Sequence, residues 1–336
     1  MWQPLRLMAL LFALAGAFPA AAQELSGSGS TFIFPVMTKW LDAYEKASGV
    51  RIRYQPIGSS AGIGEIRASV VDFGVTDAPL NNAQLLRDGL MQFPLVIGAV
   101  VPVVNLDGIA PGQLRFTGKL LADIYLGRVK NWNDPAIAAV NPDTALPNRP
   151  ILPVYRTDGS GTTFNFANFL AKSSPDWNAK IGASTSVAWP VGSGGKGNRG
   201  VGEMVTSVEG SIGYVEFSFA QQKKLAYGVV QNRAGNFVMP DAESFLAAIS
   251  GVDWSKTPDF DVLLTDAPEA NAFPIMATSF ALLHKYPKRP ERNREAFEFF
   301  QWALEKGQDL ASGLSYVPLP APLVSQVEGY WKTAIN

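Results

Sequence analysis

The segment VRIRYQPI, which begins at Val50, alternates between hydrophobic and polar positions. Val50, Ile52 and Tyr54 would share one face of an extended chain, and arginine and glutamine side chains would share the other. A period of two residues is typical of a strand that is buried on one face. We therefore predict a half-buried strand here.

The segment that precedes this strand follows the helical period instead. Pro35 would lie in the first turn of a helix, where the missing amide hydrogen costs little, and Gly49 would end the helix in a left-handed conformation. Spacings of three and four residues place the apolar side chains on one side of that helix. These side chains are Met37, Trp40, Leu41 and Tyr44.

The order of strand, glycine-rich turn and helix returns later in the chain. The segment ILPVYRTDGSGTTFNFANFLAK, from Ile151, predicts another such unit, and Pro290 begins a further helix that ends at Gly307. Strands and helices that alternate in this way predict an α/β fold. The predicted buried face of the last helix consists of Ala296, Phe297, Phe300, Ala303 and Leu304.

Two distant segments share a pattern that bears on domain organisation. FPLVIGAVVPVVN begins at Phe93 and FPIMATSFALLHK begins at Phe273, and each enters an apolar strand. A chain of 336 residues suggests about two domains. We expect the chain to cross between two lobes through adjacent strands, and the domain bounds follow from these crossings. They are a discontinuous lobe I of residues 23–95 plus 280–336, a lobe II of residues 96–279, and hinge crossings near 93–105 and 273–285.

The N-terminus has the features of a secretory signal peptide. Arg6 supplies a positive charge, an apolar run follows from Leu7 to Phe18, and small residues lead to an expected cleavage after Ala22. The apolar run is shorter than the ~20 residues that a membrane-spanning helix needs. We predict a signal peptide over 1–22 and a periplasmic protein; an uncleaved anchor and a buried helix are the alternatives. The sequence contains no cysteine, so lipid attachment at the cleavage site is not expected.

Composition argues against several classes of function. The formal net charge is −1, which disfavours nucleic acid as the main partner. Without cysteine there is no thiol nucleophile and no thiolate metal site. His284 is the single histidine, and no G-x-S-x-G elbow accompanies it. We therefore expect a protein that is not an enzyme and that needs no metal or cofactor.

Three turns combine glycine with hydroxyl residues at predicted helix starts: GSGSTF (27–32), IGSSAG (57–62) and DGSGTTF (158–164). Helix N-termini carry unpaired N–H groups and the positive end of the helix dipole, so they attract anions. Glycine allows a ligand to approach the backbone, and serine or threonine adds a donor. Each turn alone is explained by ordinary helix capping. The three together favour a shared anion site.

Charged residues near these turns refine the prediction. Arg156 can pair with an oxyanion through two N–H groups, and Asp158 can hold it in place; a plain surface pair is the alternative. The segment VVDFGVTDAPL also carries Asp72 and Asp77. A carboxylate suits an anion site if the ligand keeps a proton, as phosphate does and sulfate does not. Either acid could instead brace a turn.

The ordered motifs resemble the periplasmic phosphate-binding proteins of ABC phosphate-import systems. The resemblance covers nearly the whole mature chain and includes YQPIGSSAG, VDFGVTDAPL, DIYLGRVKNWNDPAI, RTDGSGTTF, WPVGSGGKGN and GSIGYVEF. It implies a two-lobed, hinged periplasmic-binding-protein fold, similar to type II, in which each lobe is a sheet flanked by helices. It also implies a dehydrated phosphate in the cleft between the lobes, a membrane permease as partner, and a monomer.

The resemblance also implies roles for individual residues. Phe32 would bind phosphate through its backbone N–H, and Asp77 would accept a hydrogen bond from the ligand's proton. Arg156, oriented by Asp158, would supply the positive charge. The complete set implied to bind phosphate is Thr31, Phe32, Ser59, Asp77, Arg156, Ser160, Gly161 and Thr162.

Some features depart from the family pattern or suggest other functions. Ser30 and Ala61 stand where the family has alanine and glycine, and we expect neither to alter the site. VGSGGKGN fails as a P-loop because Gly197, and not serine or threonine, follows Lys196. The basic run HKYPKRPERNRE predicts a solvated loop, and a contact with a transporter is the alternative.

The rival functions are a receptor for a related oxyanion or phosphonate, a secreted phosphatase and an adhesive protein.

Overall fold

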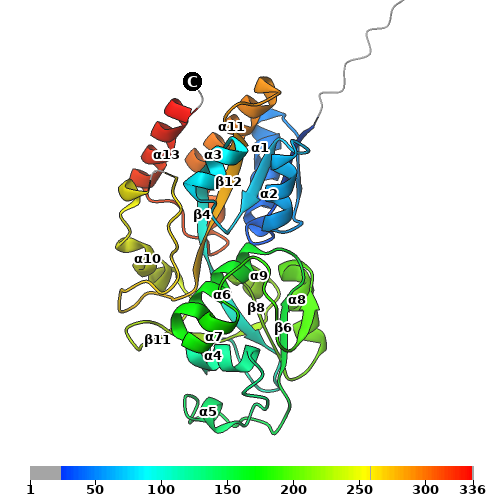
Figure 1. Ribbon diagram of the computed structural model, residues 1–336, viewed down its shortest axis with the longest axis vertical. Helices are drawn as coiled ribbons and strands as arrows, with labels where there is room; N and C mark the ends of the chain where they lie inside the picture. Colours follow the sequence, from blue (N-terminus) through cyan, green and yellow to red (C-terminus); the bar gives the residue numbers. More distant parts are fainter. Residues whose placement is uncertain (1–23, 258, 335–336) are drawn as a thin grey trace, which may run out of the picture.

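Two α/β bodies stacked along the long axis make up the molecule (Figure 1). A computed structural model describes residues 24–257 and 259–334. One body, upper in Figure 1, contains the first and last parts of the chain, and the other contains the central part. The predicted two-lobed α/β fold is confirmed, whereas the predicted signal peptide lies outside the described residues.

The main sheet runs through both bodies in the strand order β2-β1-β3-β12-β4-β8-β6-β7, and β9 also pairs with β4. Its strands are β1 (Leu25–Gly29), β2 (Ile52–Gln55), β3 (Phe73–Thr76), β4 (Leu90–Val104), β6 (Leu152–Arg156), β7 (Ser193–Gly195), β8 (Ser211–Glu216), β9 (Ala226–Tyr227) and β12 (Met276–His284). A smaller sheet pairs β11 (Phe237–Val238), β10 (Val229–Gln231) and β5 (Arg115–Phe116).

Helices cover the sheet in both bodies; for example, α2 packs on β1 and β3, and α8 packs on β6 and β8. Helices drawn in the upper body are α1 (Phe34–Ser48), α2 (Ser59–Arg67), α3 (Asn82–Asp88), α11 (Pro290–Glu305) and α13 (Ala321–Ala334), and α12 (Gln308–Ser312) packs against α1 and α11. The central segment supplies α4 (Gly118–Tyr125), α5 (Pro135–Ala138), α6 (Gly161–Ser173), α7 (Pro175–Lys180), α8 (Gly197–Ser207), α9 (Phe217–Gln222), α10 (Ala242–Ser250) and a 3-10 turn at Trp254–Lys256.

The first helix shows why the sequence pattern predicts local structure well. Pro35 lies in the first turn of α1, and Gly49 ends the helix with a φ of 76°, which glycine adopts without strain. The side chains of Trp40 and Tyr44 are buried, and the Trp40 indole donates a hydrogen bond of 2.7 Å to the carbonyl of Gly307. The predicted face of α11 is likewise buried.

The long strand β4 connects the two bodies. It pairs antiparallel with β12 along residues 90–99 and with β8 along residues 100–104. The two Phe-Pro segments therefore form adjacent strands, as predicted. The register between β4 and β12 shifts between Ser279 and Phe280, opposite Pro94. Proline cannot donate to the ladder, which is why it is found at such bulges.

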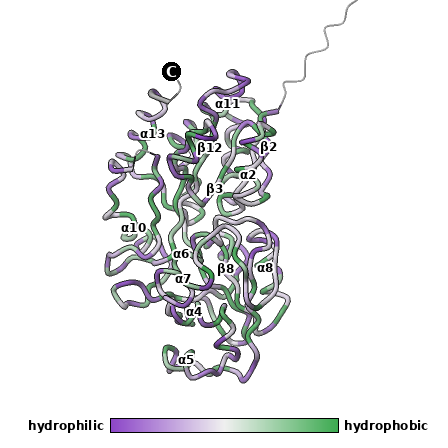
Figure 2. Tube along the Cα trace, viewed as in Figure 1, coloured by the Kyte–Doolittle hydropathy of each residue, from purple (hydrophilic) through white to green (hydrophobic). Residues whose placement is uncertain are grey.

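The hydrophobic core is continuous across both bodies and contains Phe32, Trp132, Tyr214 and Phe300 among its buried residues. Figure 2 shows hydrophobic stretches through the central strands and hydrophilic stretches on α11 and the outer loops. Among residues 24–257 and 259–334, no helix combines the length and apolarity that a membrane span needs.

Candidate anion-binding site between the two bodies

The site begins where β1 and β3 end. These strands are parallel neighbours, so the residues that follow them, Ser30 and Asp77, emerge at the same edge of the sheet. Gly29 makes the approach possible: its φ is 138°, and a Cβ there would lie 2.0 Å from the carbonyl oxygen of Val75. The Ser30 N–H donates to that oxygen at 2.9 Å. The Ser30 hydroxyl then donates to Asp77 Oδ2 at 2.6 Å.

The first residue of α2 is Ser59, which touches both bodies. Gly58 precedes it with a φ of 102° and no side chain caps this helix. The Ser59 hydroxyl accepts hydrogen bonds from the N–H of Asp77 at 3.2 Å and from the N–H of Gly161 at 3.1 Å. Because Gly161 begins α6 in the other body, Ser59 connects the two bodies at their interface.

The start of α6 contributes its N-cap, Ser160, and its first two residues, Gly161 and Thr162, all of them buried. Ser160 is an ordinary N-cap, since its hydroxyl accepts from the N–H of Thr163 at 3.0 Å. Gly161 is required by a close approach, because a Cβ there would lie 2.6 Å from Asp77 Cβ. This contact brings the start of α6 directly against Asp77.

The first turn differs from the prediction in one respect. Helix α1 begins at Phe34 and its N-cap is Ile33, so Thr31 and Phe32 precede the helix and do not cap it. Pro35 sets this start, because proline fits only the first turn of a helix. The Phe32 N–H donates to the Ser30 hydroxyl at 2.9 Å, and its carbonyl accepts from the Tyr316 hydroxyl at 2.7 Å.

Arg156 ends β6 and lies in the same interface. Its Nε donates to Asp158 Oδ1 at 2.8 Å, its Nη2 bonds Asp158 Oδ2, and its Nη1 donates to Thr162 Oγ1 at 3.1 Å. The Arg156 side chain is 1% exposed, so the plain surface pair considered above is wrong. Burial opposes ionisation of Asp158, but the hydrogen bonds and charge of Arg156 outweigh it and lower the pKa of this carboxyl.

Asp77 is the buried acid of the site, and its partners are hydroxyl groups. The Ser279 hydroxyl donates to Asp77 Oδ1 at 2.6 Å, and Ser30 and Ser59 approach Oδ2. Burial raises the pKa of Asp77 to about 6, although these hydroxyls and Arg156 oppose the shift. At neutral pH the carboxyl is ionised and can only accept hydrogen bonds.

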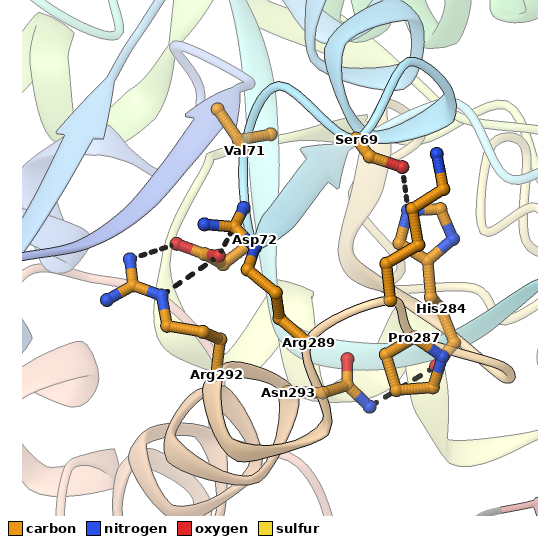
Figure 3. A pocket seen from close by; sticks show the side chains of 9 residues that line it. Ser69, Val71, Asp72, His284, Pro287, Arg289, Arg292 and Asn293 are labelled. Carbon is orange, nitrogen blue, oxygen red and sulfur yellow. Dashed lines mark hydrogen bonds and ion pairs between the residues drawn. The ribbon is translucent and has the colours of Figure 1, made fainter. Parts of the chain in front are cut away.

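Asp72 lies at the other end of β3 and has a different role (Figure 3). Its carboxylate accepts from Arg292 Nη2 at 2.6 Å and from the hydroxyl and N–H of Ser26 at 2.9 Å, and Arg289 Nη2 lies 3.2 Å away. Burial raises the pKa of Asp72, but Arg292 and Ser26 outweigh it, and the net shift is downward. Asp72 thus braces α11 against β1, and part of the basic run is bound in this cluster rather than solvated. His284 lines the same pocket.

The segment VGSGGKGN supports the site from the other body. The Gly197 N–H donates to Asp158 Oδ1 at 2.8 Å. The N–H and side-chain amide of Asn198 donate to Thr31 Oγ1 at 3.3 and 3.1 Å. This loop therefore bonds both the arginine's partner and the first turn. Sequence reasoning found the segment but not its role.

The structure brings all eight predicted site residues to this interface, and it adds Ser30, Ser279 and Asn198, which sequence reasoning missed. Ser30 was expected to leave the site unaltered, yet its hydroxyl bonds two of the predicted residues. Ser279 gave no local signal. In the described part of the chain, no group of three or more His, Asp or Glu side chains is placed to hold a metal ion.

Comparisons with known proteins show the family and the fold of this chain. The sequence model of the PBP superfamily domain matches residues 16–306. The phosphate-binding protein PstS of Xylella fastidiosa is 50% identical over 317 residues, which cover 93% of this chain and 87% of that protein. The corresponding protein of Haemophilus influenzae is 47% identical, with 96% of both chains covered. A solved phosphate-binding protein from Stenotrophomonas maltophilia aligns with a TM-score of 0.70 at 16% identity, over 92% of this chain and 94% of that one.

The fold and the matched span place this protein in the PBP superfamily of two-lobed binding proteins. Identities of 45–50% over most of the chain are more specific. The chain belongs to the PstS family of phosphate-binding proteins.

Proposed function

We propose that this protein binds inorganic phosphate and delivers it to an ABC importer. One observation carries the proposal: a buried carboxylate, Asp77, and a buried guanidinium, Arg156, meet at one interface among hydroxyl and N–H donors. The names of the relatives, which are phosphate-binding proteins, support the same conclusion. The protein acts as a receptor and not as an enzyme.

The residues divide the recognition of phosphate between charge and protonation. Arg156 supplies positive charge, and Thr31, Ser59, Ser160 and Thr162 supply hydroxyl donors, with N–H groups of Phe32 and Gly161 beside them. Above its pKa of about 6, Asp77 is ionised and accepts a hydrogen bond from the proton that phosphate still carries. Sulfate carries no proton at this pH. The Asp77 carboxylate and a sulfate oxygen, both negatively charged, would then face each other with no proton between them. This repulsion is the basis on which we expect phosphate to be selected.

Closure of the two lobes forms the site. We propose that lobe I comprises residues 23–95 and 280–336, that lobe II comprises 96–279, and that the hinges lie near 93–105 and 273–285. Hydrogen bonds between the bodies support a closed state. They run from Gly161 N to Ser59 Oγ, from Ser60 N to the Gly159 carbonyl, and from Asn198 to Thr31.

The cellular setting follows from the same family membership and the N-terminal sequence. We propose that residues 1–22 direct export, that the mature protein is a periplasmic monomer, and that a permease of an ABC phosphate importer is its partner. Among the rivals, a receptor for a related oxyanion or phosphonate differs only in ligand and is distinguished by titration.

The experiment is calorimetric titration of the ligand-stripped mature protein with phosphate and then with sulfate at pH 7.5. We expect one-to-one binding of phosphate and no heat from sulfate. Equal binding of both anions, or of neither, would contradict the proposed function. Sulfate tests the electrostatics of the site with an anion of nearly the same size and shape, so it is the matched control.

A further inference from the structure

We infer that the Ser30 hydroxyl is a built-in competitor of phosphate and sets the affinity of the site. The inference rests on the proposed function. Ser30 is fully buried. Its hydroxyl donates to Asp77 Oδ2 at 2.6 Å and accepts from the Phe32 N–H at 2.9 Å.

These two hydrogen bonds are the ones that a protonated phosphate oxygen would make. Such an oxygen accepts from an N–H and donates its own proton to a carboxylate, as the Ser30 hydroxyl does. The two oxygens of a carboxylate offer about four acceptor sites. The hydroxyls of Ser30, Ser59 and Ser279 use three of those of Asp77, so Asp77 can accept from the ligand as well. The Phe32 N–H has a single hydrogen. It must leave Ser30 before it can bind phosphate.

The surroundings of Ser30 leave its hydroxyl little freedom except rotation about χ1. Its N–H donates to the Val75 carbonyl at 2.9 Å, and its carbonyl accepts from the Tyr54 hydroxyl at 2.8 Å. Gly29 fixes the preceding bend. Phosphate binding therefore exchanges one existing hydrogen bond for a new one, and this exchange reduces the net gain.

Ser30→Ala removes the competitor. One neutral hydrogen bond corresponds to an affinity change of roughly 2- to 10-fold, and we expect the variant to bind phosphate more tightly by that factor. Ser28→Ala is the matched control. Ser28 is a buried serine in β1, two residues before Ser30, and its hydroxyl has no hydrogen-bond partner in the described structure. Its replacement should leave the affinity unchanged.

The affinities are measured by calorimetric titration with inorganic phosphate at pH 8, where Asp77 with a pKa of about 6 is ionised. Thermal unfolding verifies that both variants are folded. Tighter binding by Ser30→Ala alone supports the inference. If the native protein binds phosphate, unchanged or weaker binding by Ser30→Ala overturns the inference and leaves the proposed function intact. A native protein that does not bind phosphate overturns the proposed function as well.

NMR of the native protein provides a second test that needs no variant. The Hα–Hβ couplings of Ser30 report its χ1 angle, and the amide resonance of Phe32 reports its hydrogen-bond acceptor. Both should change when phosphate is added. Couplings of Ser30 that stay the same on saturation with phosphate would overturn the inference.

Discussion

Asp72 and Asp77 flank the same short strand, β3, yet the fold gives their carboxylates different partners. Asp72 faces the guanidinium groups of Arg289 and Arg292, and its pKa is lowered despite burial. Asp77 faces the hydroxyls of Ser30 and Ser279, and burial raises its pKa to about 6. Both carboxylates are buried, so burial alone does not determine what an acid does.

The two carboxylates differ in whether their partners leave them able to accept a further hydrogen bond from a ligand. The guanidinium groups of Arg289 and Arg292 hold the Asp72 carboxylate ionised and in a structural contact. A hydroxyl can rotate and exchange its acceptor, so the carboxylate that it bonds can still accept a hydrogen bond from a ligand. The Asp72 cluster therefore stabilises the packing of α11 against β1, whereas the Asp77 cluster is suited to binding.

The largest effect on binding is expected from Arg156→Ala. The change removes the guanidinium of the site and leaves the buried carboxylate of Asp158 without it. We expect this loss to lower the free energy of unfolding by about 3–5 kcal/mol. We expect phosphate affinity to fall by at least about 100-fold in calorimetric titration. Arg292→Ala is the control in the other cluster: it should lower stability and leave affinity near the native value. Similar affinity losses in both variants would remove the distinction between the clusters.

A smaller effect, on stability alone, is expected from Asp72→Asn. The neutral side chain removes the carboxylate partner of Arg292, which keeps the carbonyl of Glu24. We expect the free energy of unfolding to drop by about 3 kcal/mol, the lower end of the cost of breaking a buried pair. Urea unfolding in phosphate-free buffer measures the change, because bound ligand would mask it. An unaltered stability would show that Asp72 does not brace α11.

The smallest effects concern the dependence of stability on pH. As pH falls, protonation of Asp77 should raise the free energy of unfolding, and protonation of Asp72, at lower pH, should lower it. The native pKa of Asp77 is raised from 3.8 to about 6, so the native state binds this proton more tightly, and its stability rises as pH falls from 7 to 5. The native pKa of Asp72 is lowered, so its contribution is complete above the ordinary value of 3.8 and is lost only as pH falls through the native pKa.

Two variants separate these contributions in urea unfolding at pH 7 and pH 5. Relative to Asp77→Asn, the native protein should gain stability at pH 5. Relative to Asp72→Asn, its advantage should be the same at both pH values, because Asp72 is ionised at each. If the free energies of unfolding of the native protein and Asp77→Asn differ by the same amount at pH 7 and pH 5, the pKa of Asp77 is not raised.

Much of the fold could be predicted from local pattern. The helix that ends at Gly49, the half-buried strand at Ile52 and Tyr54, and the pairing of the two Phe-Pro segments all follow from short-range periodicity or similarity. The two acids carried a weaker signal: ligands bind at the carboxyl ends of parallel strands, and Asp77 follows β3 whereas Asp72 precedes it.

The remaining parts of the site depend on contacts between distant segments. Ser279 reaches Asp77 across 202 residues because β12 lies beside β3, next to a register shift opposite Pro94. Asn198 bonds Thr31 only because the two bodies meet. Neither contact leaves a local pattern in the sequence, so neither could be predicted.

The selection of phosphate depends on Asp77, which we propose accepts a hydrogen bond from the proton of the ligand. The most direct test is to titrate the native protein and Asp77→Asn with phosphate and with sulfate at pH 7.5. The variant loses the charged acceptor of the ligand's proton, so we expect phosphate binding to weaken by about 10- to 100-fold. The asparagine amide can donate to an unprotonated oxygen, so we also expect measurable sulfate binding. Unchanged affinities for both anions in Asp77→Asn would contradict the account.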